Sequence, residues 1–423
     1  MRGNRREEKG VFIWRKHEFR CRYDRVRLYV VLAACVSVGC SSSETEFRTG
    51  LESLGRDEFK ALAGRRVGVV TNPTGVDREL RSTIELIAQS PHVDLAAVFG
   101  PEHGVKGSAQ AGVKVADSGG LRGVPVYSLY GATRRPTTAM LSRIDVMLFD
   151  MQDVGVRTYT YVSTLLEVMR AAAAHGTEVW VLDRPVPIGG SIVEGPMLEV
   201  KFESFVGPHP VPLRHGLTVG EYASMMNIEK GLNARLRVVR MEGYRRNLPM
   251  AVTGQPWIAP SPNIATLESA FVYSGTVLIE GTNLSEGRGT TRPFQLIGAP
   301  WLDGQRLAGV LRGLDLPGCK FRGTFFTPTL SKYEGEECGG IEIYVSDRAT
   351  FRPVEVTVAL LCAVRSLYPT KLEIDAERFD RLAGTASLRE AIEGGEPYSK
   401  IVECWRVPLT QYEERRQKFL LYE

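Results

Sequence analysis

Short apolar runs alternate with helix-like segments through the first half of the chain. A helix is predicted from the capping residue Ser82 to about Gln89, and another over 161–175. The run at 144–149 is largely aliphatic, as is typical of a strand buried on both faces. This alternation predicts a parallel sheet covered by helices, a Rossmann-like domain over about 55–205. The predicted strands are 66–71, 94–99, 124–129, 144–149 and 179–182.

The second half has a different pattern, in which loops rich in glycine and proline separate short elements. Helices are expected over 218–230 and from about 359 to Ser366. These elements indicate a second domain of the α+β class over 206–423. The strand-like runs in this half are 236–241, 276–279, 340–345 and 355–358.

The N-terminus has the pattern of a targeting segment. An apolar, uncharged run over 28–38 follows several arginines, and it is too short to span a bilayer as a helix. Gly39, Cys40 and the serines at 41–43 then resemble a bacterial lipoprotein processing site. We therefore expect a targeting segment over 1–40, with Cys40 as the lipid-anchored residue. Cys35 as the processing site, plain secretion and no processing remain alternatives.

A lipid anchor implies a place in the cell envelope, periplasmic or extracytoplasmic, with the membrane as a partner. Residues 41–54 would then form a tether. Four cysteines remain after the anchor, and because none forms a C-x-x-C pair, a zinc site is not expected. Disulfides and buried free thiols are both compatible with these positions.

Composition excludes some classes of partner. The chain has 53 basic and 49 acidic residues, a net charge of +4, which does not favour nucleic acid. No G-x-G-x-x-G follows a predicted strand, and no G-x-x-x-x-G-K-[ST] is present, so the usual phosphate-binding loops are missing. H-E-x-x-H and G-x-S-x-G are missing as well. We expect neither a metal nor another cofactor.

Acids and arginines follow several predicted strands. In an open parallel sheet, ligands bind beyond the carboxyl ends of the strands, so these side chains are expected at one edge. Glu102 stands between Pro101 and His103 just past a buried strand, and partial desolvation would favour the protonated carboxyl that a general acid needs. Paired carboxylates without a metal or cofactor favour a glycosidase. The other strand-end candidates are Asp150, Asp153, Arg157, Tyr159 and Asp183.

Polar loops in the second half add further candidates. The segment 279–293 is rich in glycine and charge, which makes poor core and good ligand contact. The segments 212–216 and 260–263 have the same character. The candidate residues in these loops are Arg214, His215, Asn263, Asn283, Glu286, Arg288 and Arg292.

Several of these motifs together resemble one family, the exo-β-N-acetylmuramidases of the NamZ type. The resemblance implies a Rossmann-like domain followed by a smaller α+β C-terminal domain, with the site between them. It also implies release of terminal β-linked N-acetylmuramic acid from the non-reducing end of peptidoglycan fragments. Val186 and Ala265 depart from the family's usual Asn and Pro. The matching segments are 69–75, 99–104, 127–131, 150–161, 260–263 and 280–294.

In this resemblance Glu102 is the catalytic glutamate. The second carboxylate is expected to be Asp153, with Asp150 and Glu286 as alternatives, and the 2-acetamido group of the sugar as another. The other candidates, with Asn72 from the first motif, are expected to bind substrate. Arginines would hold its lactyl carboxylate, with Arg157, Arg214, Arg288 and Arg292 as candidates. A non-catalytic muropeptide-binding lipoprotein and a hydrolase of another bond remain the rival readings.

Overall fold

The computed structural model describes residues 46–121, 123–248 and 250–423. The predicted targeting segment and Cys40 lie outside the described residues. The part that is described forms one compact unit. None of its helices is long and apolar enough to cross a bilayer. Its four cysteines, Cys319, Cys338, Cys362 and Cys404, are free thiols.

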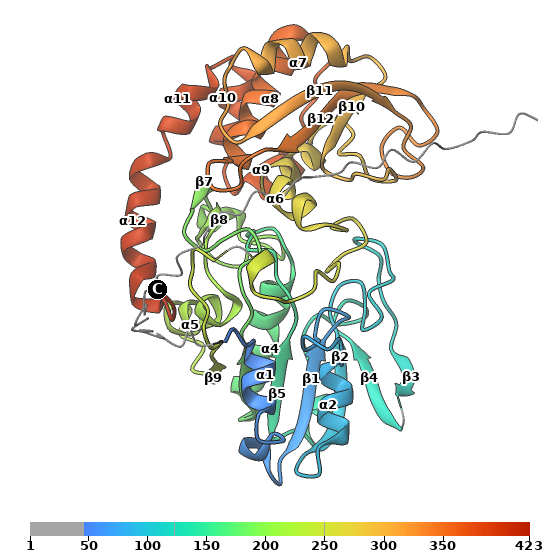
Figure 1. The fold of residues 1–423 in the computed structure, drawn as a ribbon, viewed down its shortest axis with the longest axis vertical. Coiled ribbons are helices and arrows are strands. Elements are labelled where there is room, and N and C mark those ends of the chain that lie inside the picture. The colour runs from blue at the N-terminus through green and yellow to red at the C-terminus, as the bar shows by residue number, and fades with distance from the viewer. Residues whose placement is uncertain (1–45, 122, 249) are drawn as a thin grey trace, which may run out of the picture. The chain divides into compact units, whose positions relative to one another are not determined.

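A mixed sheet forms the centre of the first half (Figure 1). Its strands lie in the order β3-β4-β2-β1-β5-β6-β9, and all neighbours are parallel except β3 and β4. If β3 is left out and the six parallel strands are numbered from 1 to 6 along the chain, their order in the sheet is 3-2-1-4-5-6, the Rossmann arrangement. The strands are β1 Arg66–Thr71, β2 Asp94–Gly100, β3 Ser118–Leu121, β4 Val124–Ser128, β5 Val146–Asp150, β6 Glu178–Leu182 and β9 Arg235–Val239.

All five predicted strands of the first half and both helices are confirmed. In β5, Val146 and Leu148 pack under α1 (Gly50–Gly55) and α2 (Thr83–Gln89). Met147 and Phe149 belong to the core on the opposite face, with residues of α4 (Tyr161–His175) and α5 (Val219–Glu229). The strand is therefore buried on both faces. The sheet also takes β9 from beyond residue 205.

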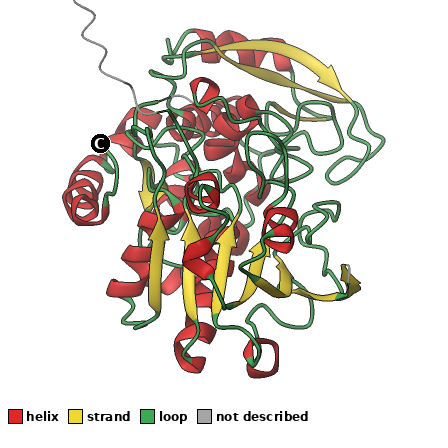
Figure 2. Cartoon of the chain, turned by 60° about the horizontal axis from the view of Figure 1, so that its bottom comes forward, coloured by secondary structure: helices red, strands yellow, loops and turns green. Residues whose placement is uncertain are grey.

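The second half places helices against a small antiparallel sheet of order β10-β12-β11 (Figure 2). A further two-stranded sheet joins β7 and β8. The strands are β7 Glu194–Met197, β8 Pro212–Arg214, β10 Leu296–Ala299, β11 Cys319–Phe326 and β12 Cys338–Val345. The remaining helices are α3 Thr138–Leu141, α6 Leu267–Thr276, α7 Gly304–Arg312, α8 Pro353–Leu367, α9 Ala376–Ala383, α10 Ser387–Glu393, α11 Tyr398–Glu403 and α12 Arg406–Arg416.

Two strands predicted in the second half are wrong. The run at 276–279 ends α6 and enters the 3-10 helix Val277–Gly281. The run at 355–358 lies inside α8, which begins at Pro353, a residue suited to the first helical turn. Both runs are buried and rich in β-branched residues, and such runs lack the periodicity that separates a buried helix from a strand.

The last residues of the chain return to the sheet of the first half. Figure 1 shows α12 running from α11 towards α5. On α12, Arg415 pairs with Glu229 at 2.8 Å and Arg416 donates to the carbonyl of Gly190 at 3.2 Å. Beyond it, the Tyr422 hydroxyl donates to Asp183 Oδ2 at 2.7 Å, just past the end of β6. The C-terminal segment therefore contacts residues of both halves of the chain.

Candidate active site

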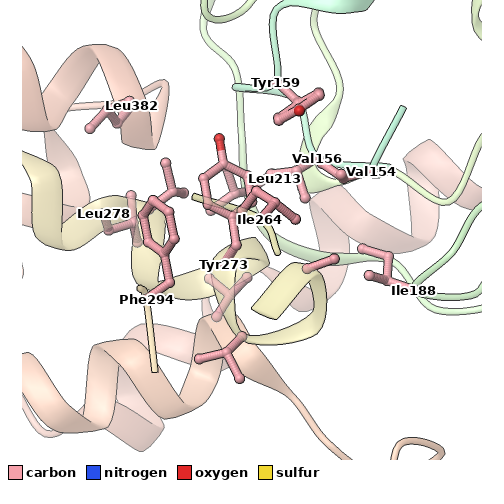
Figure 3. Close-up of a cluster of buried hydrophobic side chains, with 14 of the residues drawn as sticks. Val154, Val156, Tyr159, Ile188, Leu213, Ile264, Tyr273, Leu278, Phe294 and Leu382 are labelled. Atoms are coloured by element: carbon pink, nitrogen blue, oxygen red, sulfur yellow. The ribbon is translucent and has the colours of Figure 1, made fainter. Parts of the chain in front are cut away.

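A cavity of about 670 Å³ opens beyond the carboxyl ends of β2 and β5. Its volume is within the range of small-molecule sites. The loops after these strands provide one wall, and α6, α9 and the loops 280–294 and 330–332 provide the other. Tyr159, Ile264, Tyr273, Phe294 and Leu382 line it from the buried cluster drawn in Figure 3. The apolar wall of the cavity is therefore continuous with the core.

Glu102 lies in this cavity on a tight turn directly after β2. The turn closes through a bond from the Gly104 amide to the Pro101 carbonyl at 2.9 Å, and His103 has φ 70°. The Glu102 side chain is 8% exposed. Its Oε1 accepts from the Gly112 amide at 2.8 Å and its Oε2 from the Thr160 hydroxyl at 2.6 Å. Each oxygen keeps a further lone pair, so the group can still exchange a proton with a bound substrate.

His103 and Tyr130 surround this carboxyl group. The Nδ1 of His103 lies 2.6 Å from the Ala109 carbonyl and must be the protonated nitrogen, since a carbonyl only accepts. Burial lowers the pKa of His103 in spite of the nearby Glu102, which favours the neutral ring with Nε2 as an acceptor. Burial, and then Glu102, raise the pKa of Tyr130 to about 12. Both rings are therefore uncharged at neutral pH.

A network of charges forms the opposite wall. Arg288 lies 2.8 Å from Glu280 and 3.1 Å from Glu286, while Lys332 lies 3.1 Å from Glu286. Arg378 also contacts Glu280, at 2.9 Å. Burial acts to raise the pKa of Glu280, but the two arginines outweigh it, so the pKa is lowered. The Glu280 carboxylate is therefore held in its charged form by fixed cations.

The structure brings five of the predicted site residues together in the cavity: Glu102, His103, Tyr159, Glu286 and Arg288. The other predicted residues do not line it, and most of them hold the loops that do. Their catalytic and binding roles stay predictions. The residues outside the cavity are Asn72, Asp150, Asp153, Arg157, Asp183, Arg214, His215, Asn263, Asn283 and Arg292.

The acids at the ends of the strands bond to other groups of the protein and do not line the cavity. Asp150 pairs with the guanidinium of Arg184 at 2.6 Å, and both are buried. Asp183 accepts from the Gly220 amide at 2.9 Å, at the start of α5. Asp153 accepts from the Gly155 amide at 2.7 Å. Asp153 is buried and does not line the cavity, and this burial raises the pKa of its carboxyl group to about 7.

Two predicted arginines and a histidine are also interior. Arg157 is fully buried and donates only to backbone carbonyls, among them Pro196 at 2.9 Å and Ala383 at 2.7 Å. Arg214 donates to the Ile188 carbonyl. His215 Nδ1 accepts from the Leu217 amide at 3.1 Å, and burial lowers the pKa of His215 to about 3.

Three asparagines and one arginine remain, and they support loops or line a neighbouring groove. Asn72 donates to the Tyr161 hydroxyl at 2.7 Å, and Asn283 donates to the Lys371 carbonyl at 2.8 Å. Arg292 pairs with Glu342 at 2.9 Å. Asn263 and Arg292 line a neighbouring groove that shares Gln110 and Leu330 with the cavity.

Sequence reasoning missed several residues of the cavity. Tyr130, Thr160 and Glu280 lie inside the segments that resemble the family, but the sequence did not indicate that these particular side chains line the cavity. Arg134, Lys332 and Arg378 come from segments without a motif, and only the fold brings them to the site. Among residues 46–121, 123–248 and 250–423, no group of three or more His, Cys, Asp or Glu side chains is placed to hold a metal ion.

A glutamate beside a cation-rich cavity, at the carboxyl edge of a parallel sheet, is the arrangement of a glycosidase that acts through carboxylates. The comparisons with known proteins agree with this class. The chain belongs to the NamZ exo-β-N-acetylmuramidase family: residues 67–268 match its N-terminal domain and residues 271–422 its C-terminal domain.

The relatives extend over nearly the whole chain. A peptidoglycan β-N-acetylmuramidase NamZ of Bacillus subtilis (strain 168) is 45% identical over 384 residues, covering 90% of this chain and 93% of its own. A crystal structure of a DUF1343 family protein from Bacteroides fragilis NCTC 9343 superposes with a TM-score of 0.83 at 38% identity. A second such protein from that organism gives 0.71 at 28%. Each comparison covers 89% of this chain and 99% of the other.

Proposed function

We propose that this protein is an exo-acting glycosidase that releases terminal β-linked N-acetylmuramic acid from the non-reducing end of peptidoglycan fragments. The observation that carries the proposal is Glu102, placed in a cavity whose cationic side chains outnumber its carboxylates. N-Acetylmuramic acid differs from N-acetylglucosamine by a lactyl ether that carries a carboxylate. A cation-rich cavity suits this anionic sugar.

In this proposal Glu102 protonates the glycosidic oxygen as the bond to the anomeric carbon breaks. The departing saccharide keeps that proton. Water adds its oxygen to the anomeric carbon, and the proton that this water gives up restores the Glu102 carboxyl group, directly or through solvent. Positive charge develops on the sugar ring during this step. Glu286 lies in the same cavity and is held in place by Arg288 and Lys332, so it is the carboxylate that we favour for stabilising this charge.

The test is hydrolysis of para-nitrophenyl β-N-acetylmuramic acid beside the matching β-N-acetylglucosamine compound. We expect release of nitrophenolate from the muramic substrate and little from the other, because only the first carries the lactyl carboxylate. If neither compound is hydrolysed while muropeptides bind tightly, the protein is a binding protein and the proposed activity is wrong.

We also propose that the protein is held in the cell envelope by a lipid on Cys40. The support is the arginine-flanked apolar run over 28–38, followed by a small residue, the cysteine and a serine tether. Labelled palmitate should be incorporated into the unaltered protein and lost in Cys40→Ser. Cys35→Ser is the matched control and should retain the label. The reverse pattern would move the anchor to Cys35.

A further inference from the structure

Five cationic side chains line the cavity, and they differ in whether a carboxylate already neutralises them. Arg288 and Arg378 share Glu280, and Lys332 pairs with Glu286. Arg381 pairs with Glu377 on its own helix. A substrate carboxylate would have to compete with these acids for each of the four cations. The fifth cation is Arg134, which has no hydrogen bond and no ion pair to any residue that the structure describes.

Arg134 is held by two aromatic rings instead. Its guanidinium carbon lies 4.1 Å from the ring centre of Phe205 and 5.2 Å from that of Tyr130. The two ring centres lie 5.9 Å apart. The Phe205 carbonyl accepts from Ser163 at 2.6 Å, which fixes the backbone at Phe205 to α4. Stacking on a ring engages the face of a guanidinium and leaves its N–H groups at the edge free to donate.

The position of Arg134 relative to Glu102 also fits a substrate contact. Tyr130, which supports Arg134, lies near enough to Glu102 for the carboxylate to contribute to the raised pKa of the phenol. Arg134, Tyr130 and Glu102 line the same cavity, and both Glu102 and Phe205 are hydrogen-bonded to the start of α4, through Thr160 and Ser163. A substrate whose glycosidic oxygen reaches Glu102 therefore occupies the cavity that Arg134 also lines.

We infer that Arg134, with Phe205 and Tyr130, forms a carboxylate subsite that binds the lactyl group of the terminal N-acetylmuramic acid. A guanidinium edge binds a carboxylate through two parallel hydrogen bonds, and no acid of the protein has to be displaced. The subsite would make the enzyme select muramic acid over glucosamine. The inference rests on the proposed function.

The test changes the enzyme and the substrate together. Arg134→Gln keeps a polar side chain that can still donate a hydrogen bond and removes its charge. The methyl ester of the lactyl group of para-nitrophenyl β-N-acetylmuramic acid removes the charge of the substrate. We expect the unaltered protein to lose about 10- to 100-fold in kcat/KM on the ester, the effect of one lost charge-assisted pair, mainly through KM. Arg134→Gln should lose as much on the free acid and should treat acid and ester alike.

Arg135→Gln is the matched control. This neighbouring arginine pairs with Glu167 at 2.6 Å and does not line the cavity, so its variant should discriminate between acid and ester as the unaltered protein does. Thermal unfolding should change only slightly in Arg134→Gln, since the side chain makes no hydrogen bond with the described residues and loses only its stacking on Phe205 and Tyr130. If Arg134→Gln still discriminates fully, the subsite is wrong and the proposed function stands. If the unaltered protein hydrolyses neither compound, both are wrong.

Discussion

Replacing Glu102 by glutamine is expected to reduce hydrolysis of a muramic acid–glucosamine disaccharide by about 10²–10⁴-fold, the usual contribution of a general acid. A saccharide is a poor leaving group and needs a proton as its bond breaks. Glutamine has nearly the same shape, and its amide can still meet Gly112 and Thr160, because a hydroxyl both donates and accepts. The fold should therefore survive while the proton donor is lost.

Two substrates identify the step at which Glu102 acts. Nitrophenolate leaves without protonation, so the loss of activity on the para-nitrophenyl substrate should be much smaller than the loss on the disaccharide. Equal losses on both would mean that Glu102 acts on water or on the sugar rather than on the leaving oxygen. Undiminished activity on both would remove Glu102 from the mechanism. Thermal unfolding of the variant serves as the control for its fold.

Replacing Arg157 by methionine is expected to destabilise the protein by about 3–5 kcal/mol, because four buried carbonyls lose their donors at a cost of about 1 kcal/mol or more each. The guanidinium donates to the carbonyls of Pro196 and Val211 on one side and to those of Leu382 and Ala383, at the end of α9, on the other. Methionine fills similar space and leaves these acceptors buried without donors.

Chemical denaturation measures this effect. The matched control is Arg66→Met, because Arg66 is partly exposed and pairs with Asp145 at 2.8 Å on the surface. Removing an exposed pair of this kind should lower the free energy of unfolding far less than Arg157→Met does. A loss in Arg157→Met as small as that of the control would show that water replaces the missing donor, and that the bonds across the two halves contribute little.

The parallel sheet was predictable because its strands alternate regularly with helices. The helix predicted over 161–175 has those bounds in the structure, where Gly176 ends it in a left-handed conformation. Buried elements of the second half were harder to predict, since they carry apolar residues on every side and so lack the periodicity that separates a helix from a strand. In α8 the one local signal against a strand was Pro353, which fits the first turn of a helix.

Part of the site was predictable for the same reason. The carboxyl end of β2 delivers Glu102 and His103 to the cavity, as the topology of an open sheet requires. The sequence does not show in which direction a strand-end side chain points. Arg157 and Asp183 both follow predicted strands, and both could have faced a ligand. In the structure the Arg157 guanidinium donates to carbonyls as far as 226 residues away, and the Asp183 carboxylate accepts from α5 and from Tyr422.

The return of the C-terminal segment to β6 has a consequence for the order of events during synthesis. The Tyr422 hydroxyl reaches Asp183 across 239 positions, and the Glu423 carbonyl accepts from the Arg246 amide. Until the ribosome has made these residues, the buried Asp183 carboxyl lacks one of its donors. Burial already raises the pKa of Asp183 to about 6, so each missing donor matters. The hydrogen bonds of Asp183 can therefore be completed only after residue 422 has been made.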